Sequence, residues 1–347
     1  MIWLTWRQSR VNALVVYAAL LLVAAALAVT GPHLADVYGR SASTFLDWIA
    51  TRKLDRTLYV VGTAAGFVVP ALIGAFWGAP MIARELETGT HRLVWSQTVT
   101  RNRWLATKLA VGLVGAMTAS GVLGLALTWW AHPVDKAVNA STRSQVSNVF
   151  RAARLSPELF ASRGIAPIGY AAVAFVLGVL AGAVIRRTVP AMAVTLAAYV
   201  VIQVVMPTLV RPHLVSPAES TTAIAPGSIH GIMGSGPDGP IERLDVGAAP
   251  GGAWVLTNET VDAHGHPVNS FGRWVTDCLG PPRTDPTVET PEKNACYQRL
   301  AAEGYRHHLS YQPAASYWTL QSRETGVLLV GAGLLVGACF WRVRRLS

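Results

Sequence analysis

The chain has 347 residues, of which 52% are hydrophobic and 14% are charged, and its formal net charge at pH 7 is +10. Because soluble domains carry about 25% charged residues, this composition excludes an ordinary soluble protein and indicates a membrane protein. The positive charge predicts membrane lipid as a partner and no nucleic acid, since it is divided between the two faces of a bilayer.

Six stretches of the chain lack ionisable side chains and are long enough to cross about 30 Å of hydrocarbon as helices. Backbone polar groups cannot stay unpaired in lipid, so each stretch is predicted to be a helix. The stretches are Val11–Thr30, Leu58–Pro80, Leu109–Trp130, Ala166–Ile185, Thr188–Val210 and Thr325–Trp341. The fold class that we predict is an all-α polytopic membrane protein with six transmembrane helices and a small external domain between helices 5 and 6.

The first stretch follows a short segment in which Trp3 and Trp6 precede Arg7 and Arg10. This pattern predicts a short interfacial helix that leads into the first span. The apolar stretch is longer than a typical signal-peptide core and has no convincing cleavage site, so we expect it to be retained as a span.

Lys and Arg gather on one side of the predicted spans. Segments Met1–Arg10, Met81–Lys108, Arg186–Arg187 and Arg342–Ser347 hold 12 of the 29 Lys and Arg. Positive charge near span ends marks the cytoplasmic side of a membrane. We therefore expect a multi-pass protein of the plasma membrane with both termini and Met81–Lys108 in the cytoplasm.

The segment Met81–Lys108 is charged and helix-forming, and it lies between two spans. It is either a docking surface for a cytoplasmic partner or a solvated loop that only sets topology. On the other side, the connectors Gly31–Thr57 and Ala131–Ile165 have amphipathic character. The second connector predicts an interfacial helix from apolar residues at helical spacing. Those residues are Val146, Val149, Phe150 and Ala153.

Small residues at four-residue spacing recur in the spans and favour close packing within one bundle over a dedicated dimer seam. The pairs are Gly62 and Gly66, Gly74 and Gly78, Gly178 and Gly182, and Gly333 and Gly337. Pro70, Pro190 and Pro207 are expected to bend spans two and five or to mark their ends.

The segment Arg211–Ser322 is rich in Pro and Gly and is large enough for a small extracytoplasmic domain. Its start, PGSIHGIMGSGPDGP, is predicted to be a loop, Ala253–Thr257 a strand and Lys293–Ala302 a short helix. The predicted division of the chain is 1–210 for five spans, 211–322 for this domain, and 323–347 for the sixth span and a cytoplasmic tail.

Two of the three cysteines, Cys278 and Cys296, fall in this predicted external domain. In an oxidising compartment a disulfide between them is favoured over two free thiols. The third, Cys339, lies within the sixth predicted span.

Chemical motifs are mostly absent from the sequence. There is no GxxxxGK[ST] loop, so the chain is not expected to bind and hydrolyse ATP by itself. His264 with His266, and His307 with His308, have no nearby Cys or carboxylate ligands, and we predict no metal site. The apolar stretches lack the acids and bases that ion-coupled carriers place within their spans, which argues against such a carrier.

Three stretches of the sequence resemble a known family. The stretch RELETGTHRLVWSQTVTRNRWLATKL resembles the segment after the second span of ABC-2 type permeases, the membrane subunits of one class of ATP-binding-cassette exporters. The stretches GVLAGAVIRRTVPAMAVTL and YQPAASYWTLQSRETG resemble actinobacterial members of the family. The residues that match the first motif are Glu85, Glu87, Gly89, Thr90, Arg101 and Lys108.

The resemblance implies a separate cytoplasmic ABC ATPase subunit in two copies, which binds ATP and Mg²⁺, and no cofactor in this chain. It also implies a second permease subunit, as a homodimer or a paralogous heterodimer, around a path lined largely by spans two and five. Candidate path residues are Phe67, Phe76, Gln203 and Met206. Candidate ATPase-coupling residues are Arg84, Glu85, Glu87, Gly89, Thr90, His91 and Arg92.

We thus expect a non-enzymatic permease subunit of an exporter that moves an apolar or amphipathic substrate, such as a drug, lipid or peptide. The alternative is a membrane-anchored sensor or accessory subunit whose external domain binds a ligand.

Overall fold

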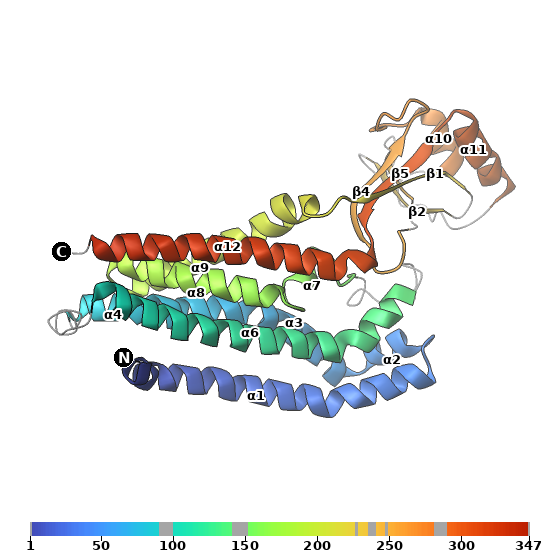
Figure 1. The fold of residues 1–347 in the computed structure, drawn as a ribbon. Coiled ribbons are helices and arrows are strands. Elements are labelled where there is room, and N and C mark those ends of the chain that lie inside the picture. The colour runs from blue at the N-terminus through green and yellow to red at the C-terminus, as the bar shows by residue number, and fades with distance from the viewer. Residues whose placement is uncertain are drawn as a thin grey trace. The chain divides into compact units, whose positions relative to one another are not determined.

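The computed structural model describes residues 2–89, 100–140, 152–225, 228–234, 241–246, 249–280 and 290–345. These residues form two compact units (Figure 1). The helical unit contains Met1–Ala137, Ser156–Leu214 and Tyr317–Ser347, and the sheet unit contains Val138–Leu155 and Val215–Ser316.

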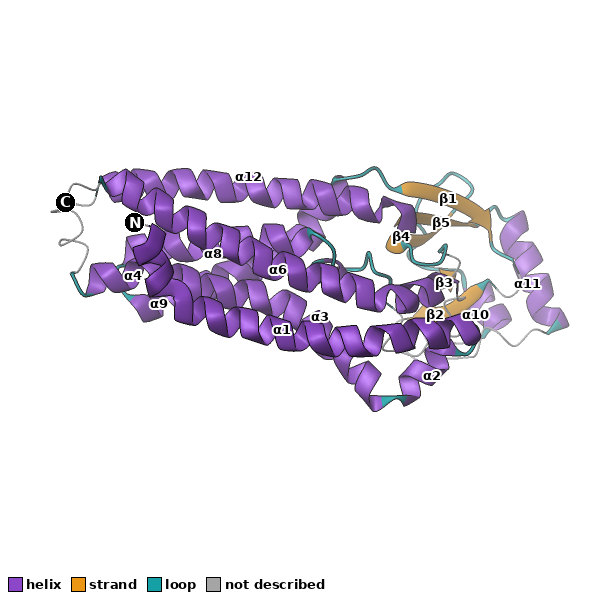
Figure 2. Cartoon of the chain, turned by 60° about the horizontal axis from the view of Figure 1, so that its bottom comes forward, coloured by secondary structure: helices purple, strands orange, loops and turns teal. Residues whose placement is uncertain are grey.

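The helical unit is a bundle of long helices that run side by side (Figures 1 and 2). Its first part contains α1 (Ile2–Arg40), α2 (Phe45–Thr51), α3 (Lys53–Leu72), the π-helix η1 (Ile73–Gly78), α4 (Ala79–Glu87) and α6 (Arg101–Ala140). Its second part contains α7 (Pro157–Phe160), α8 (Ala166–Ile185), α9 (Thr188–Val205), the π-helix η3 (Met206–Val210), the 3₁₀-helix η4 (Arg211–His213) and α12 (Tyr317–Arg344).

Six helical segments among the described residues are long and apolar enough to cross a membrane, so the prediction of six spans is confirmed. The segments are Val16–Arg40, Lys53–Glu87, Arg101–Ala140, Ala166–Ile185, Thr188–His213 and Ala314–Arg344. Most of them extend beyond the predicted apolar stretches, and only the fourth keeps its predicted bounds.

The first helix differs from the prediction, since α1 is one continuous helix of 39 residues. The predicted interfacial segment and the first span therefore form one helix. The physical reason is that no Gly or Pro occurs between Ile2 and Thr30, so nothing ends the helix near Arg10. Of the residues of the interfacial helix predicted in the second connector, Val146, Val149 and Phe150 lie outside the described residues.

Spans two and five each contain a π-helix next to a proline. Pro70 lies near the end of α3, just before η1, and Pro207 lies within η3. Because proline has no N–H to donate, it disrupts the regular hydrogen-bond ladder and favours such irregular turns. Spans two and five are thus the irregular helices of the bundle.

Helix α8 is the centre of the bundle and packs against α3, η1, α4, α9 and α12. It is apolar on all sides, as expected for a helix surrounded by other helices. Gly178 lies against the backbone of Gly74 and Ala79. A Cβ added at Gly74 would lie 2.6 Å from the carbonyl oxygen of Ala174. Two of the predicted glycine pairs, in span two and in α8, therefore face one another.

We predict that Gly178→Ala lowers the thermal unfolding temperature, although alanine is the better helix former by about 1 kcal/mol. The added methyl group forces two backbones apart, which costs about 1–3 kcal/mol. Gly333→Ala is the matched control, because no described atom lies within 4 Å of the position of its added Cβ. Thermal unfolding of both purified variants checks this, and equal unfolding temperatures would contradict the packing argument.

The sheet unit contains the strands of the described chain (Figure 2). Its elements are β1 (Ala218–Ala223), β2 (Ile229–Gly234), β3 (Ile241–Val246), β4 (Trp254–Val261), α10 (Arg273–Leu279), α11 (Pro291–Ala302), β5 (Arg306–Gln312) and the 3₁₀-helix η5 (Ala314–Ser316). Strand β5 lies between β1 and β4 in an antiparallel sheet, and β2 pairs with β3 in a second.

The sequence anticipated only part of this unit. The predicted strand Ala253–Thr257 and helix Lys293–Ala302 correspond to β4 and α11, and both predictions are confirmed. The predicted initial loop is wrong where β2 forms. The sequence missed β2 because its glycines weaken the strand pattern, and pairing with β3 supplies the missing stability.

The sheet unit has its own core, and the predicted Cys278–Cys296 disulfide is confirmed, with the two Cα atoms 5.8 Å apart. The bridge joins α10 to α11 beside a cluster of buried apolar side chains. The cluster contains Ile224, Ile229, Ile232, Ile241, Leu244, Val246, Phe271, Val275, Leu279, Cys296, Tyr297 and Leu300. A covalent link between these two helices restricts the unfolded chain and so supports a small core.

Candidate functional site

One end of the helical unit, here called the basic end, is where α4 and α8 stop and α6 and α9 begin. The basic side chains at these helix ends are Arg84, Arg101, Arg103, Arg186, Arg187, Arg342 and Arg344. Arg344 of α12 also donates a hydrogen bond from Nε to Oδ1 of Asn102 on α6, at 3.5 Å. The opposite end of the unit is called the distal end.

At the basic end a buried ion pair joins α4 to α6. Nζ of Lys108 donates to Oε1 of Glu85 and to the carbonyl oxygen of Met81, the latter at 3.3 Å. The Lys108 side chain is 6% exposed and that of Glu85 16%. Because removing one partner of a buried pair leaves the other charge unpaired, this contact holds the two helices together firmly.

A second carboxylate joins α4 to the start of α9. Oε2 of Glu87 accepts a hydrogen bond from the backbone N–H of Thr188 at 3.1 Å and from its hydroxyl at 2.7 Å. Thr188 is the first residue of α9, where free N–H groups and the helix dipole favour a negative charge. Glu87 thus caps a helix that is far away in sequence.

These contacts change the role expected for the coupling residues. Glu85 and Glu87 were candidate anchors for a partner, but both carboxylates bind within the chain. Arg84 is exposed, and Gly89, which follows α4, has φ +73°, a backbone conformation that favours glycine. The remaining candidates, Thr90, His91 and Arg92, lie outside the described residues.

Two of the four candidate path residues, Phe67 and Gln203, meet at a tyrosine that sequence reasoning missed. Oη of Tyr199 donates to the carbonyl oxygen of Phe67 at 2.9 Å, and Nε2 of Gln203 donates to Tyr199 Oη at 2.6 Å. Spans two and five are therefore bonded to each other here. Met206 is buried at the start of η3, whereas Phe76 is 54% exposed. The signal for Tyr199 was its position one helical turn before Gln203.

At the distal end a fully buried ion pair joins spans five and six. Arg211 Nε and Nη2 donate to the two carboxylate oxygens of Glu324, at 2.6 and 3.0 Å. The hydroxyl of Tyr170 on α8 also donates to Glu324, at 2.8 Å, and the ring of Phe160 lies 4.1 Å from the Arg211 guanidinium. Arg211 and Glu324 each lie one residue beyond a predicted apolar stretch, where the helical segments continue.

The side chain of Gln321 on α12 holds the start of α8. Its Oε1 accepts from the backbone N–H groups of Ile165 and Ala166, at 2.9 and 2.7 Å. Its Nε2 donates to the carbonyl oxygens of Phe160 and Arg163, at 3.0 and 3.1 Å. All its hydrogen-bonding capacity is thus used to fix the turn between α7 and α8.

A third ion pair lies beside this turn. Arg163 Nη1 donates to Oδ1 of Asp135 on α6 at 3.0 Å, and the guanidinium lies 4.7 Å from the ring of Tyr59. Both charged side chains are buried, at 3% and 10% exposed. Together with Arg211 and Glu324, they make the distal end a polar, internally bonded network.

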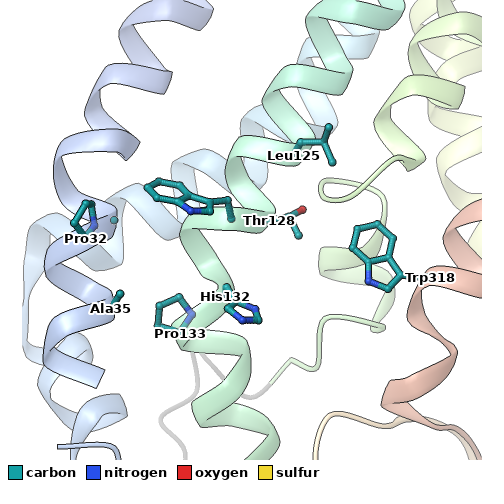
Figure 3. Close-up of a pocket in the computed structure, with 9 residues that line it drawn as sticks. Pro32, Ala35, Leu125, Thr128, His132, Pro133 and Trp318 are labelled. Carbon is teal, nitrogen blue, oxygen red and sulfur yellow. The ribbon is translucent and has the colours of Figure 1, made fainter. Parts of the chain in front are cut away.

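Two cavities border α1 and α6. The first has a volume of about 400 Å³ and lies towards the distal end (Figure 3). Its lining is Gly31, Pro32, Ala35, Leu125, Thr128, Trp129, His132, Pro133 and Trp318. Trp129 and Trp318 are about half exposed, and exposed Trp at the ends of spans is typical of the membrane interface.

The second cavity has a volume of about 520 Å³ and is lined by apolar residues of α1, α3, η1 and α6. The lining is Val16, Ala19, Leu20, Val23, Ala65, Val69, Leu72, Ile73, Phe76, Trp77 and Leu123. Of the four candidate path residues, Phe76 alone contributes to it. Phe67 and Gln203 lie instead at the Tyr199 contact.

The histidine pairs do not form a metal centre within the described part of the chain, where no group of three His, Cys, Asp or Glu is suitably placed. His307 on β5 is buried, and its Nε2 lies 2.7 Å from Oδ1 of Asn258. Burial lowers the pKa of the His307 imidazole, which keeps the ring neutral near pH 7. Its role is to hold β5 to β4.

The fold and these contacts define a multi-pass membrane protein whose charged short helix is bonded to several spans. A family model described as ABC-2 membrane transporter related matches residues 17–211. This match covers more than half of the chain, so the chain belongs to that family of ABC-type permeases. No curated protein and no solved structure matches the chain.

We predict that Glu324→Ala lowers the free energy of unfolding by about 3–5 kcal/mol, because the Arg211 charge then stays buried without its partner. Glu303→Ala is the matched control, since its ion pair with Arg299 is exposed and worth about 1 kcal/mol or less. Thermal unfolding of the purified variants checks this. Equal losses would show that the buried pair does not hold spans five and six together.

Proposed function

We propose that this chain is the membrane subunit of an ATP-driven exporter that works with a separate ABC ATPase in two copies. Permeases of this family normally work with an ABC ATPase, and the sequence has no GxxxxGK[ST] loop. In this proposal the partner binds ATP and Mg²⁺, and this chain opens and closes the path through the membrane.

The observation that carries the proposal is the set of bonds made by α4. Ala79 and Ala83 of α4 pack against Gly182 on α8. Glu85 joins α4 to α6, and Glu87 joins it to α9. A displacement of the segment that follows Gly89 would therefore be transmitted through α4 to α6, α8 and α9 together. Transmission of ATPase closure to the spans needs such a lever, since two packings of the bundle must differ in which side is open.

We assign transmission to Glu85 and Glu87 and docking to the exposed Arg84 with Thr90, His91 and Arg92. The carboxylates are already used inside the chain, whereas an exposed guanidinium is free to face an acidic partner surface. The basic end is proposed to be cytoplasmic, because Lys and Arg mark that side. The sheet unit is then external, in agreement with its disulfide.

The proposed cargo is apolar or amphipathic, such as a drug, a lipid or a peptide. The support is the apolar lining of the cavity at Phe76 and the bonding of uncharged groups at the Tyr199 contact. A second copy of the chain, or a paralogue, would complete the path.

The alternative function is a membrane-anchored sensor or accessory subunit. One observation favours it, namely that the sheet unit has its own core and disulfide and so is large enough to bind a ligand. An accessory subunit would not require bonds from α4 to both α6 and α9, which is why we favour the permease.

We predict that Glu87→Ala reduces permease-stimulated ATP hydrolysis and transport while the ATPase still co-purifies, because a transmission contact is lost and the docking surface is kept. Arg84→Glu has the opposite signature. It weakens co-purification, since each charge-assisted contact is worth about 1.5–3 kcal/mol. Arg306→Glu, an exposed reversal in the sheet unit, is the control. If all variants dock the ATPase and transport like the wild type, the segment Met81–Lys108 only sets topology. That result would strengthen the sensor alternative.

We predict that a cysteine introduced at Thr90 resists an impermeant thiol reagent in intact cells, whereas one at the exposed Glu259 reacts. The native cysteines give little background, because Cys278 and Cys296 are bridged and Cys339 is buried. Mass-tag labelling before and after cell lysis makes the measurement. Labelling at position 90 from outside would reverse the proposed orientation.

A further inference from the structure

The cavity at Phe76 is suited to a hydrocarbon chain. Its lining consists of aliphatic and aromatic residues, from Val16 and Val23 on α1 to Leu123 on α6. It differs in this from the distal cavity, which contains the Thr128 hydroxyl and the His132 imidazole. An unfilled apolar space costs dispersion contacts, so a flexible apolar occupant is favoured there.

The depth of the cavity points to the same occupant. Along α1, the stretch from Val16 to Val23 covers about 10 Å at 1.5 Å per residue, and it starts about 9 Å beyond Arg10. Phe76 lies eight residues before Arg84, which is about 12 Å if the chain stays helical. The cavity therefore begins about 9–12 Å inside the basic end and extends along the spans within the hydrocarbon layer, where the surrounding solvent is acyl chain.

Charge at the basic end selects the head group. Arg84 is exposed and lies about 12 Å from Phe76 along the helix. Basic residues near a membrane surface attract anionic lipid by about 1 kcal/mol each. When the anionic head group of a lipid lies at the basic end, its acyl chain extends to the depth of Phe76.

One wall of the cavity packs against α8 and continues into α4. Trp77 is 6% exposed, and its ring packs edge-on against Phe175 of α8 at a centroid distance of 6.2 Å. Phe76 and Trp77 belong to η1, which continues directly into α4. A molecule against this wall thus contacts the helix that bears the coupling residues.

We propose that this cavity binds the acyl chain of an anionic amphiphile, taken laterally from the leaflet at the basic end, as cargo of the exporter. The cargo assignment rests on the proposed function. The binding of the acyl chain does not rest on the proposed function, because binding is measured on the permease alone.

The test uses full-length permease in phosphatidylcholine nanodiscs that contain a little phosphatidylglycerol with a photoreactive diazirine in one acyl chain. We expect cross-links in the peptides that contain Val16–Val23 and Ala65–Trp77. The yield should exceed that of the zwitterionic phosphatidylcholine analogue by about fivefold for each basic residue engaged. Val330 and Leu334, which are exposed on α12, report bulk lipid.

The matched variants are Ala65→Leu, which fills the cavity, and Ala64→Leu, which adds the same side chain at an exposed neighbouring position outside the lining. Ala65→Leu should remove the cavity cross-links and leave those on α12 unchanged, while Ala64→Leu should match the wild type. Equal labelling in both variants would overturn the site.

The second arm measures ATP-driven transfer of the same probe between leaflets by permease that is reconstituted with its ATPase. Lower transfer by Ala65→Leu than by Ala64→Leu supports cargo, and equal transfer would mean a resident lipid only and overturn the cargo assignment. A third outcome is that Ala65→Leu loses the cavity cross-links but the wild type shows no ATP-driven transfer. That outcome would keep the binding site and count against the exporter.

Discussion

The close approach of α8 to η1 and α4 is the constraint on which the rest of the helical unit depends. Gly178 lies against the backbone of Gly74 and Ala79, which leaves no room for side chains between the helices. In lipid there is no hydrophobic force to bring helices together, so close backbone packing has to supply the attraction. This contact fixes α4 on the central helix, and the polar bonds at the basic end follow from that position.

Buried charges then complete the two ends of the bundle in different ways. At the basic end, Glu85 and Glu87 connect one short helix to two other spans. At the distal end, Glu324 gathers Arg211 and Tyr170 from different helices into one buried site. Between these ends, contacts of α1 with its neighbours leave two cavities. A bundle that is bonded at both ends and less tightly filled along α1 is suited to change its packing there.

The candidate site shows how far motif reasoning extends. The motif around Glu85 and Glu87 located the segment that bonds α4 to other spans, because charged residues between two apolar stretches stand out in sequence. It did not find their contacts within the chain, because Lys108 and Thr188 lie 23 and 101 positions away. Separation along the chain hides such pairs. Tyr199 was missed for the same reason, since its bond to Phe67 crosses 132 positions.

The sequence by itself determined the membrane class, the number of spans and the fourth span's limits, because a bilayer imposes length and apolarity on each segment separately. It also identified the family through the motif around Glu85 and predicted the Cys278–Cys296 disulfide. Only the tertiary structure decided which glycines face one another, that Arg211 is buried against Glu324, and that β5 is the central strand of a sheet. The physical reason is that these features depend on contacts between segments that are far apart in the sequence. A local pattern shows that a residue requires a partner but does not show which residue the partner is.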